Sequence, residues 1–228
     1  MTEQTAKPKP HRRWWQYSLR TFFVVLTVAC VWLGRTVHRA NEQRKAVEWV
    51  RQMRGYVVYG DAKPSGLMWL RDSLGADYFD LVLHVDLDNS QVNDLTPLAR
   101  LTGLQQLWLN ATQIRDLTPL VKLTSLQELA LGEAPVRDLT PLATLTELKW
   151  LWLSDTQVSD LTPLAGLKSL EWLDLKNTQV NDLTPLAKLT SLQKLELENT
   201  PVSKEQVKTL QQTLPNCEIY WSPPDPSP

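Results

Sequence analysis

The sequence predicts an α/β solenoid of stacked coils, with short parallel strands on a concave face and short helical turns on a convex face. The first observation is the pentapeptide DLTPL, which begins at Asp94, Asp116, Asp138, Asp160 and Asp182, each 22 residues after the last. The second is that leucines recur in the same columns of every copy. The third is an uncharged run of fourteen residues between Arg20 and Arg35, which adds a transmembrane helix to the fold.

Each coil carries seven apolar columns that one coil cannot bury alone. In one coil the columns are Leu95, Leu98, Leu101, Leu104, Leu107, Leu109 and Ile114, and the same columns recur 22 residues later. The alternation at the end of each leucine run is typical of a strand. We expect strands at 85–87, 107–109, 129–131, 151–153, 173–175 and 195–197, paired side by side at about 4.8 Å. Neighbouring coils then bury one another, and both ends of the array need caps.

DLTPL is interpreted as the corner that follows each strand. The aspartate is placed to accept backbone N–H groups in an Asx turn, the threonine to cap a short helical turn, and the proline to begin that turn. The five aspartates form a column, which raises the possibility of calcium. Since a turn-capping carboxylate already has backbone donors and the column offers few further oxygen ligands, we predict no metal and no cofactor.

The repeat LxxLxLxxTxVxDLTPLAxLTx resembles the 22-residue leucine-rich repeat of the internalins and of the phosphatase-regulating leucine-rich proteins. The resemblance covers roughly residues 80–220 and implies a right-handed solenoid with helical turns on its convex side. One column departs from the internalin pattern, in which asparagine is usual, and its members here are Ser90, Thr112, Ala134, Thr156, Thr178 and Thr200. The host-receptor contacts of internalins do not transfer column by column, so no role in invasion follows.

After Thr200 the DLTPL corner is replaced by a helical run and a final strand. Val202, Val207, Leu210 and Leu214 are the expected apolar contacts of this helix, and Cys217 and Ile219 are aligned with Leu195 and Leu197. At the other end, residues 35–54 have a helical pattern and YVVY at 56–59 a strand pattern. The predicted segments are a basic cytoplasmic tail 1–13, an anchor 14–34, a helical stem 35–54, an amino-terminal cap 55–80, repeats 81–200, a carboxyl-terminal cap 201–221 and a disordered tail 222–228.

Residues 14–34 are interpreted as a transmembrane anchor in the lipid bilayer. The uncharged run alone would cover about 21 Å as a helix, and extending it back to Trp14 gives about 31 Å, enough for a hydrocarbon core of about 30 Å. A cleaved signal peptide is the main alternative, although no A-x-A sequence follows the apolar run. A lipoprotein site at Cys30 is a second alternative, but VWL follows the cysteine where polar residues are needed.

The orientation of the anchor rests on a narrow charge difference. Five basic residues flank its amino-terminal side and four its carboxyl-terminal side, which favours a cytoplasmic amino terminus. We therefore expect a single-pass protein of the cytoplasmic (inner) membrane with an extracytoplasmic repeat domain. The basic SLRT-aromatic anchor followed by a helical stem also resembles the architecture of bacterial membrane-anchored leucine-rich proteins.

Composition excludes several functions. Residues 1–54 carry eleven Lys/Arg against three acidic residues, whereas residues 55–228 carry thirteen against twenty-two, so the repeat region is not expected to bind nucleic acid. The three histidines lie in three different segments, and no metal, phosphate-loop or nucleophile motif is present. Cys217 is interpreted as a buried edge residue. An enzyme is not expected, and neither is a small-molecule ligand.

The concave face is the predicted binding surface, because the residues between the paired leucines of each strand point away from the core. Tryptophans on this face are expected to form an exposed aromatic patch, with acidic residues around it. The predicted partner-binding residues are Trp108, Trp150, Trp152, Trp172, Asp86, Glu128, Asp155, Asp174 and Glu196, with Glu198 beside them. Tryptophan is enriched at interface hot spots, which favours a protein or peptide partner.

Three alternatives remain open from the sequence. The indoles can instead pack on one another and on their neighbours, with no binding role. A scaffold that oligomerises or docks through the helical stem would not need the concave face. A binder of glycan or cell-wall material would use tryptophan beside Asp and Asn for sugar stacking.

Overall fold

The computed structural model describes residues 19–60 and 81–224 of the 228-residue chain. Four predicted features lie wholly or partly outside these residues: the basic tail 1–13, the start of the anchor, residues 61–80 of the predicted amino-terminal cap and the end of the predicted disordered tail. The chain divides into two compact units, residues 1–39 and residues 40–228. The repeats all belong to the second unit.

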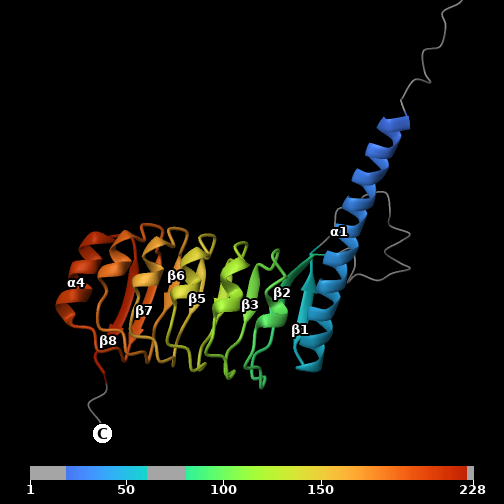
Figure 1. The fold of residues 1–228 in the computed structure, drawn as a ribbon. Helices are drawn as coiled ribbons and strands as arrows, with labels where there is room; N and C mark the ends of the chain where they lie inside the picture. The colour runs from blue at the N-terminus through green and yellow to red at the C-terminus, as the bar shows by residue number, and fades with distance from the viewer. Residues whose placement is uncertain (1–18, 61–80, 225–228) are drawn as a thin grey trace, which may run out of the picture. The chain divides into compact units, whose positions relative to one another are not determined.

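One sheet of eight strands runs through the second unit in sequence order, as Figure 1 shows. Strands β2 to β8 are all parallel, and only β1 is antiparallel to its neighbour β2. The strands are β1 Tyr56–Tyr59, β2 Val82–Asp86, β3 Gln106–Trp108, β4 Glu128–Ala130, β5 Trp150–Trp152, β6 Trp172–Asp174, β7 Lys194–Glu198 and β8 Glu218–Ser222. The predicted solenoid with parallel strands is therefore confirmed, although the three-residue strands begin and end one residue earlier than predicted.

The core consists of the predicted leucine columns. Leu107, Leu129, Leu151 and Leu173 are register partners on consecutive strands, and each is fully buried. The remaining columns of the central coils are buried in the same way. Since each leucine contacts its equivalents in the coils before and after it, burial depends on stacking.

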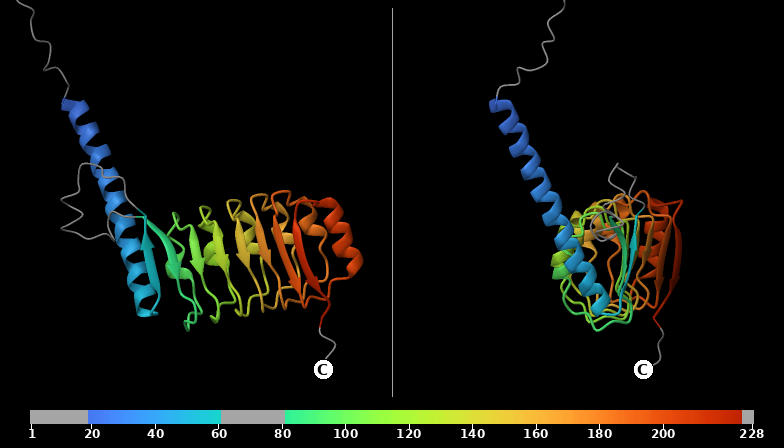
Figure 2. Two further views of the ribbon diagram at one scale, coloured as in Figure 1. Left: turned by 180° about the vertical axis from the view of Figure 1, so that it is seen from behind. Right: turned by 90° about the vertical axis from the view of Figure 1, so that its right-hand side faces the viewer.

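Short 3-10 turns form the face opposite the sheet, as Figure 2 shows. They are η1 Thr96–Leu98, η2 Thr118–Lys122, η3 Thr140–Thr144, η4 Thr162–Gly166 and η5 Thr184–Lys188. Each has proline in its first two positions. In every corner the aspartate accepts a backbone N–H two residues on, as from Thr162 N to Asp160 Oδ1 at 2.8 Å, which confirms the predicted Asx turn.

The predicted role of the corner threonine as N-cap is wrong. The N-cap position is held by the preceding leucine, such as Leu161, and no side chain caps the turn. Thr162 is instead the first residue of the turn and donates its N–H to the aspartate. The aspartate, two residues before the threonine, therefore supplies the side-chain acceptor at this corner, and the threonine hydroxyl does not cap the turn.

The column that departs from the internalin pattern has a structural explanation. The hydroxyl of Thr156 donates to the carbonyl oxygen of Leu153 at 2.6 Å, and Thr178 donates to Leu175 at 2.7 Å. Both threonines are buried. In the four coils that carry it, threonine thus closes the turn after the strand by satisfying a backbone carbonyl of the same coil.

Helix α1, Leu19–Gln52, is continuous across the described part of the predicted anchor and most of the predicted stem. Within the second unit, Ala46, Val47 and Val50 of this helix are buried in the core of the repeats. Gly55 follows at a point of close approach, where an added Cβ would lie 2.6 Å from the carbonyl oxygen of Asp86. The last turns of α1 and strand β1 therefore cover the first coil.

The carboxyl-terminal end is covered by helix α4, Lys204–Thr213, and by β8. Ser203 begins α4 with a capping box, in which it accepts the N–H of Gln206 at 3.2 Å and donates its own N–H to the Gln206 side chain at 3.0 Å. Of the predicted apolar contacts, Val202, Leu210 and Leu214 are buried and Val207 is partly buried. The predicted helix of the cap is confirmed.

The predicted alignment of β8 was wrong by two residues. Ile219 pairs with Leu195 and Trp221 with Leu197, whereas Cys217 lies before the strand and is buried. The reason is that an α-helix of ten residues replaces a 3-10 turn in the last coil. The strand therefore begins later in the sequence than the 22-residue spacing indicates.

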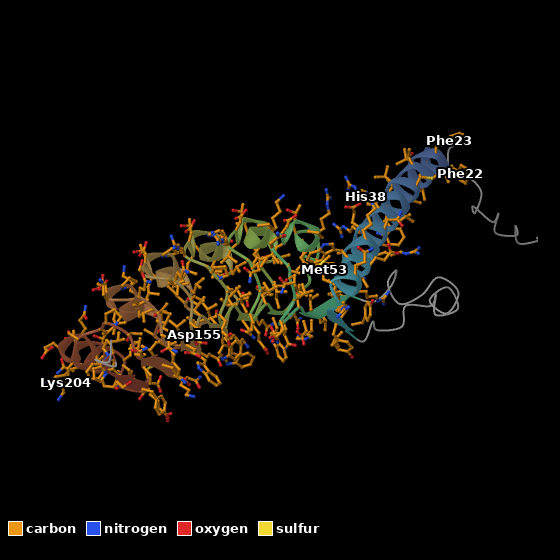
Figure 3. The ribbon with its side chains drawn as sticks, turned by 90° about the horizontal axis from the view of Figure 1, so that it is seen from below. Phe22, Phe23, His38, Met53, Asp155 and Lys204 are labelled. Carbon is orange, nitrogen blue, oxygen red and sulfur yellow. The ribbon has the colours of Figure 1, made fainter. Side chains whose placement is uncertain are left out.

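In the first unit, α1 carries many exposed apolar side chains between Phe22 and Trp32. They are Phe22, Phe23, Val24, Val25, Leu26, Val28, Val31 and Trp32, and Figure 3 labels the two phenylalanines. Among the described residues, Thr21–Gln52 is the one helix long and apolar enough to cross a membrane by length and composition. Signal sequences meet the same criterion, so this helix is a candidate span.

Candidate functional site

The outer surface of the sheet, which is the predicted concave face, is built from three outward-facing columns of side chains. Register pairing aligns His84, Gln106, Glu128, Trp150, Trp172, Lys194 and Glu218 in the first column and Asp86, Trp108, Ala130, Trp152, Asp174, Glu196 and Tyr220 in the second. The third column follows two residues later and contains Asp88, Asn110, Gly132, Ser154, Lys176, Glu198 and Ser222. Parallel in-register pairing brings equivalent residues of neighbouring coils to about 4.8 Å.

The four predicted tryptophans all lie in these columns, but they are not equally exposed. Trp108 is 36% exposed, whereas Trp150, Trp152 and Trp172 are half-buried. The rings of Trp152 and Trp172 pack on each other, with centroids 5.7 Å apart and planes tilted by 56°. The predicted exposed patch is thus partly a packed cluster, and the alternative in which indoles lie on one another holds for this pair.

Two predicted acidic residues are buried rather than exposed around the patch. Asp174 is 9% exposed and Glu196 is 6% exposed. Burial raises the pKa of Asp174, and the N–H of Lys176, which donates to its Oδ1 at 3.0 Å, opposes this rise. The prediction failed here because an outward direction on a strand does not ensure exposure when the neighbouring side chains are long.

Glu196 is the centre of an ion-pair cluster. Lys176 and Lys194 both contact its carboxylate, Lys194 at 2.5 Å from Oε1, and Lys176 also lies 3.8 Å from Glu198 Oε2. Burial raises the pKa of Glu196, but the bonds from the two lysines outweigh burial and hold the pKa below its usual value. The same bonds raise the pKa of both lysines. Glu196 is therefore an ionised, paired group.

Lys194 also contacts two aromatic rings. Its Nζ lies 4.2 Å from the ring centroid of Trp172 and 5.3 Å from that of Tyr220. The ammonium is held between an indole, a phenol and a carboxylate, which is a cation–π geometry. The sequence prediction missed Tyr220 because β8 was aligned two residues too early. It missed Lys176 because this residue follows the paired leucines of its coil and does not lie between them.

Acidic residues in the amino-terminal half of the surface have neutral partners. Glu128 accepts a hydrogen bond of 2.6 Å from the side chain of Gln106, and Asp86 accepts the backbone N–H of Asp88 at 2.9 Å. Trp108, the register partner of Asp86, is contacted by the ring of His84 at a centroid distance of 4.7 Å. Among the described residues neither carboxylate forms an ion pair.

Asp155 does not belong to the three columns. It is an exposed residue with φ of 59° in the turn after β5, and Figure 3 labels it. Its Oδ1 accepts the side-chain amide of Asn177 at 2.8 Å, and Asn177 in turn accepts that of Asn199 at 2.8 Å. The predicted position of Asp155 beside the tryptophans is corrected, because this carboxylate belongs to a ladder along the turns.

Nothing in the described residues shows a catalytic or metal site. Across residues 19–60 and 81–224, no group of three or more His, Cys, Asp or Glu could hold a metal ion. Burial raises the pKa of the Cys217 thiol to about 11, which leaves it protonated and unreactive at neutral pH. What the surface offers is an array of half-exposed indoles and carboxylates suited to binding.

Comparison with known proteins decides the family. Residues 146–186 match the family model described as Leucine Rich repeats (2 copies). The crystal structure of internalin C2 from Listeria monocytogenes is 34% identical, with a TM-score of 0.59, over 66% of this chain and 67% of that protein. The chain belongs to the internalin-like leucine-rich-repeat family. Leucine-rich-repeat folds of this kind are protein-binding scaffolds in general.

Two further structures resemble this internalin-like protein. A leucine-rich-repeat protein of Leptospira interrogans is 32% identical, with a TM-score of 0.57, over 60% of this chain and 36% of that protein. An internalin (inlF) from Listeria monocytogenes has a TM-score of 0.50 over 68% of this chain and 56% of its own, and at 23% identity it supports the fold alone. No curated protein sequence matches the chain.

Proposed function

We propose that this internalin-like protein is a single-pass membrane protein whose repeat domain binds a protein or peptide on its concave face. The observation that supports the binding surface most strongly is the set of four tryptophans in adjacent outward columns. Monomeric proteins rarely keep several indoles at least partly accessible on one face without a partner. The family supports a protein partner, because its fold serves protein binding in general.

Trp108 and Trp150 are the central contact residues in this proposal. Trp108 is the most accessible of the four indoles, and no aromatic partner covers the ring of Trp150 among the described residues. Trp152 and Trp172 extend the surface as a packed pair. Asp86 and Glu128 complete the site, whereas the buried Asp174 and the fully paired Glu196 support neighbouring side chains.

The proposed partner can be identified by proximity labelling from the repeat domain in the native cell. Binding is then compared between the native chain and a Trp150→Ser/Trp152→Ser double variant. We expect the variant to lose capture of the labelled partner. Retained capture at unchanged affinity would exclude the concave face as the binding surface, and a glycan array probed with the same protein would test the sugar-binding alternative.

A stem-mediated scaffold is less compatible with the packing of α1. The apolar residues that would associate in such a scaffold include Val47 and Val50, and both are already buried in the repeat core. Substituting them would unfold the cap rather than release a partner. The concave face therefore remains the preferred surface.

Membrane attachment forms the second part of the proposal. The exposed apolar side chains of α1 between Phe22 and Trp32 support insertion into a bilayer. We expect the full-length chain to stay with membranes after carbonate extraction and a chain starting at residue 40 to be soluble. Recovery from cells of a mature chain that begins after residue 30 would instead identify a cleaved signal.

Orientation is tested separately. An engineered surface cysteine between residues 87 and 200 should react with a membrane-impermeant thiol reagent on intact cells or spheroplasts. Protection of that cysteine until the cells are lysed would place the repeats in the cytoplasm and reverse the proposed orientation.

A further inference from the structure

The four concave tryptophans have different register neighbours. Trp172 is paired with Lys194, whose ammonium lies over the indole ring and contacts a carboxylate. The chain therefore already contains one position where a cation is held between an aromatic ring and an acid. The ammonium group of Lys194 thus provides an example, within the chain, of a cation bound on this surface.

The other three tryptophans are paired with carboxylates, and no cation of the described residues lies over their rings. Trp108 is beside Asp86, Trp150 is beside Glu128, and Trp152 is beside Asp174. Asp174 is buried and lies next to Lys176 and Glu196. The position beside Trp152 is therefore not accessible to a cation of the partner. Within residues 19–60 and 81–224, two positions remain that offer an indole and an accessible carboxylate without a positive partner.

The net charge of the three columns also favours a positively charged partner. They contain seven carboxylates against two lysines, a net charge of −5. Both lysines contact Glu196, so neither neutralises the amino-terminal half of the surface. The acidic residues are Asp86, Asp88, Glu128, Asp174, Glu196, Glu198 and Glu218.

We propose that the partner segment is basic, and that its arginine or lysine side chains lie over Trp150 and Trp108 against Glu128 and Asp86. This inference rests on the proposed function, because it names the chemistry of the partner at the same site. A guanidinium or ammonium over an indole gains cation–π attraction, and the adjacent carboxylate adds a charge-assisted hydrogen bond.

The two positions also set the spacing of the basic residues. They are two strands apart and two residues apart along the strand, which corresponds to roughly 12 Å for strands at about 4.8 Å and about 3.3 Å per residue. An extended peptide covers that distance in about four residues. The preferred ligand therefore carries two basic residues separated by about four positions.

The test uses full-length protein in detergent micelles and a seven-residue peptide with arginine at its second and sixth positions and glycine elsewhere. The matched control peptide has citrulline, which is uncharged and nearly isosteric, in place of both arginines. Calorimetry at low salt should give a dissociation constant at least about fivefold lower for the arginine peptide, and binding should weaken as salt rises.

Matched protein variants locate the effect. Glu128→Gln keeps the size of the side chain and should weaken binding of the arginine peptide by about two- to fivefold. Glu147→Gln removes the same charge from an exposed residue outside the columns and should leave binding unchanged. Lys194→Met should strengthen binding, because it removes a repelling cation and frees the ring of Trp172.

Three outcomes would overturn the proposal: no measurable binding of the arginine peptide, equal binding of both peptides, or equal loss in the two glutamate variants. None of these outcomes would affect the proposed function. If the partner found by proximity labelling still depends on Trp150 and Trp152, the concave face binds it through another chemistry. Only capture that is independent of both tryptophans would remove the proposed function as well.

Discussion

The turn after each of the strands β2 to β7 places one residue in the left-handed region, and this column allows a precise stability prediction. The column contains Asn89, Ala111, Glu133, Asp155, Asn177 and Asn199, with φ between 53° and 60°. For an ordinary residue this conformation costs roughly 1–2 kcal/mol, whereas glycine adopts it freely but loses about 0.5–1 kcal/mol of chain entropy. We therefore expect Ala111→Gly to raise the free energy of unfolding by about 0.5–1 kcal/mol.

Asn177 provides the matched comparison. Its side chain donates to Asp155 and accepts from Asn199, so both Asn177→Gly and Asn177→Ala lose these bonds. The alanine variant alone retains strain, and it should be less stable than the glycine variant by about 0.5–1 kcal/mol. Urea unfolding followed by circular dichroism measures all three variants. If Ala111→Gly destabilises the chain, or the two Asn177 variants are equally stable, the strain argument is wrong.

Three further predictions follow from burial and titration. Leu151→Ala removes a fully buried side chain between two coils and should cost about 2–5 kcal/mol in urea unfolding; a cost below about 1 kcal/mol would contradict the column assignment. Asp116, Asp138, Asp160 and Asp182 have pKa values lowered first by the side-chain and then by the backbone hydrogen bond of the threonine two residues on. The pKa of each of these carboxyl groups in the folded chain lies below the unfolded value of 3.8. Their contribution to the free energy of unfolding is therefore complete above pH 3.8 and is lost as the pH falls through the folded pKa. The melting temperature of Asp160→Asn should accordingly lie below that of the native chain at pH 6, with the gap closing towards pH 2; a constant gap would refute this linkage. Cys217, with its pKa at about 11, should resist iodoacetamide at pH 8 until the chain is unfolded, and rapid labelling of the folded chain would show that the thiol is accessible.

The repeat architecture was predictable because every coil has the same apolar columns and must bury them in the same way. A residue such as Leu151 has equivalents 22 residues before and after it, and only stacking buries all of them. The Asx turn at Asp160 was predictable for a similar reason, since its geometry depends on residues adjacent in sequence. Local and repeated sequence patterns therefore predicted most of the fold.

Features that depend on non-repeated contacts were not predictable. The pattern of α1 does not reveal that Val47 and Val50 pack on the first coil. The alignment of β8 shifted because the last coil has a longer helix, which moved Tyr220 next to Lys194. Alternation along β7 showed that Glu196 points outward but not that two lysines enclose it.

The most direct test of the concave-face claim compares stability and capture in the Trp150→Ser/Trp152→Ser variant. Both indoles are half-buried on the outer side of the sheet, so the variant should lose less stability than Leu151→Ala and remain folded. A Glu147→Ser/Lys168→Ser variant, altered at exposed positions outside the columns, provides the control. The tryptophan variant is expected to lose its partner while the control retains it. A folded tryptophan variant that captures the partner with native affinity would contradict the proposed binding on this face.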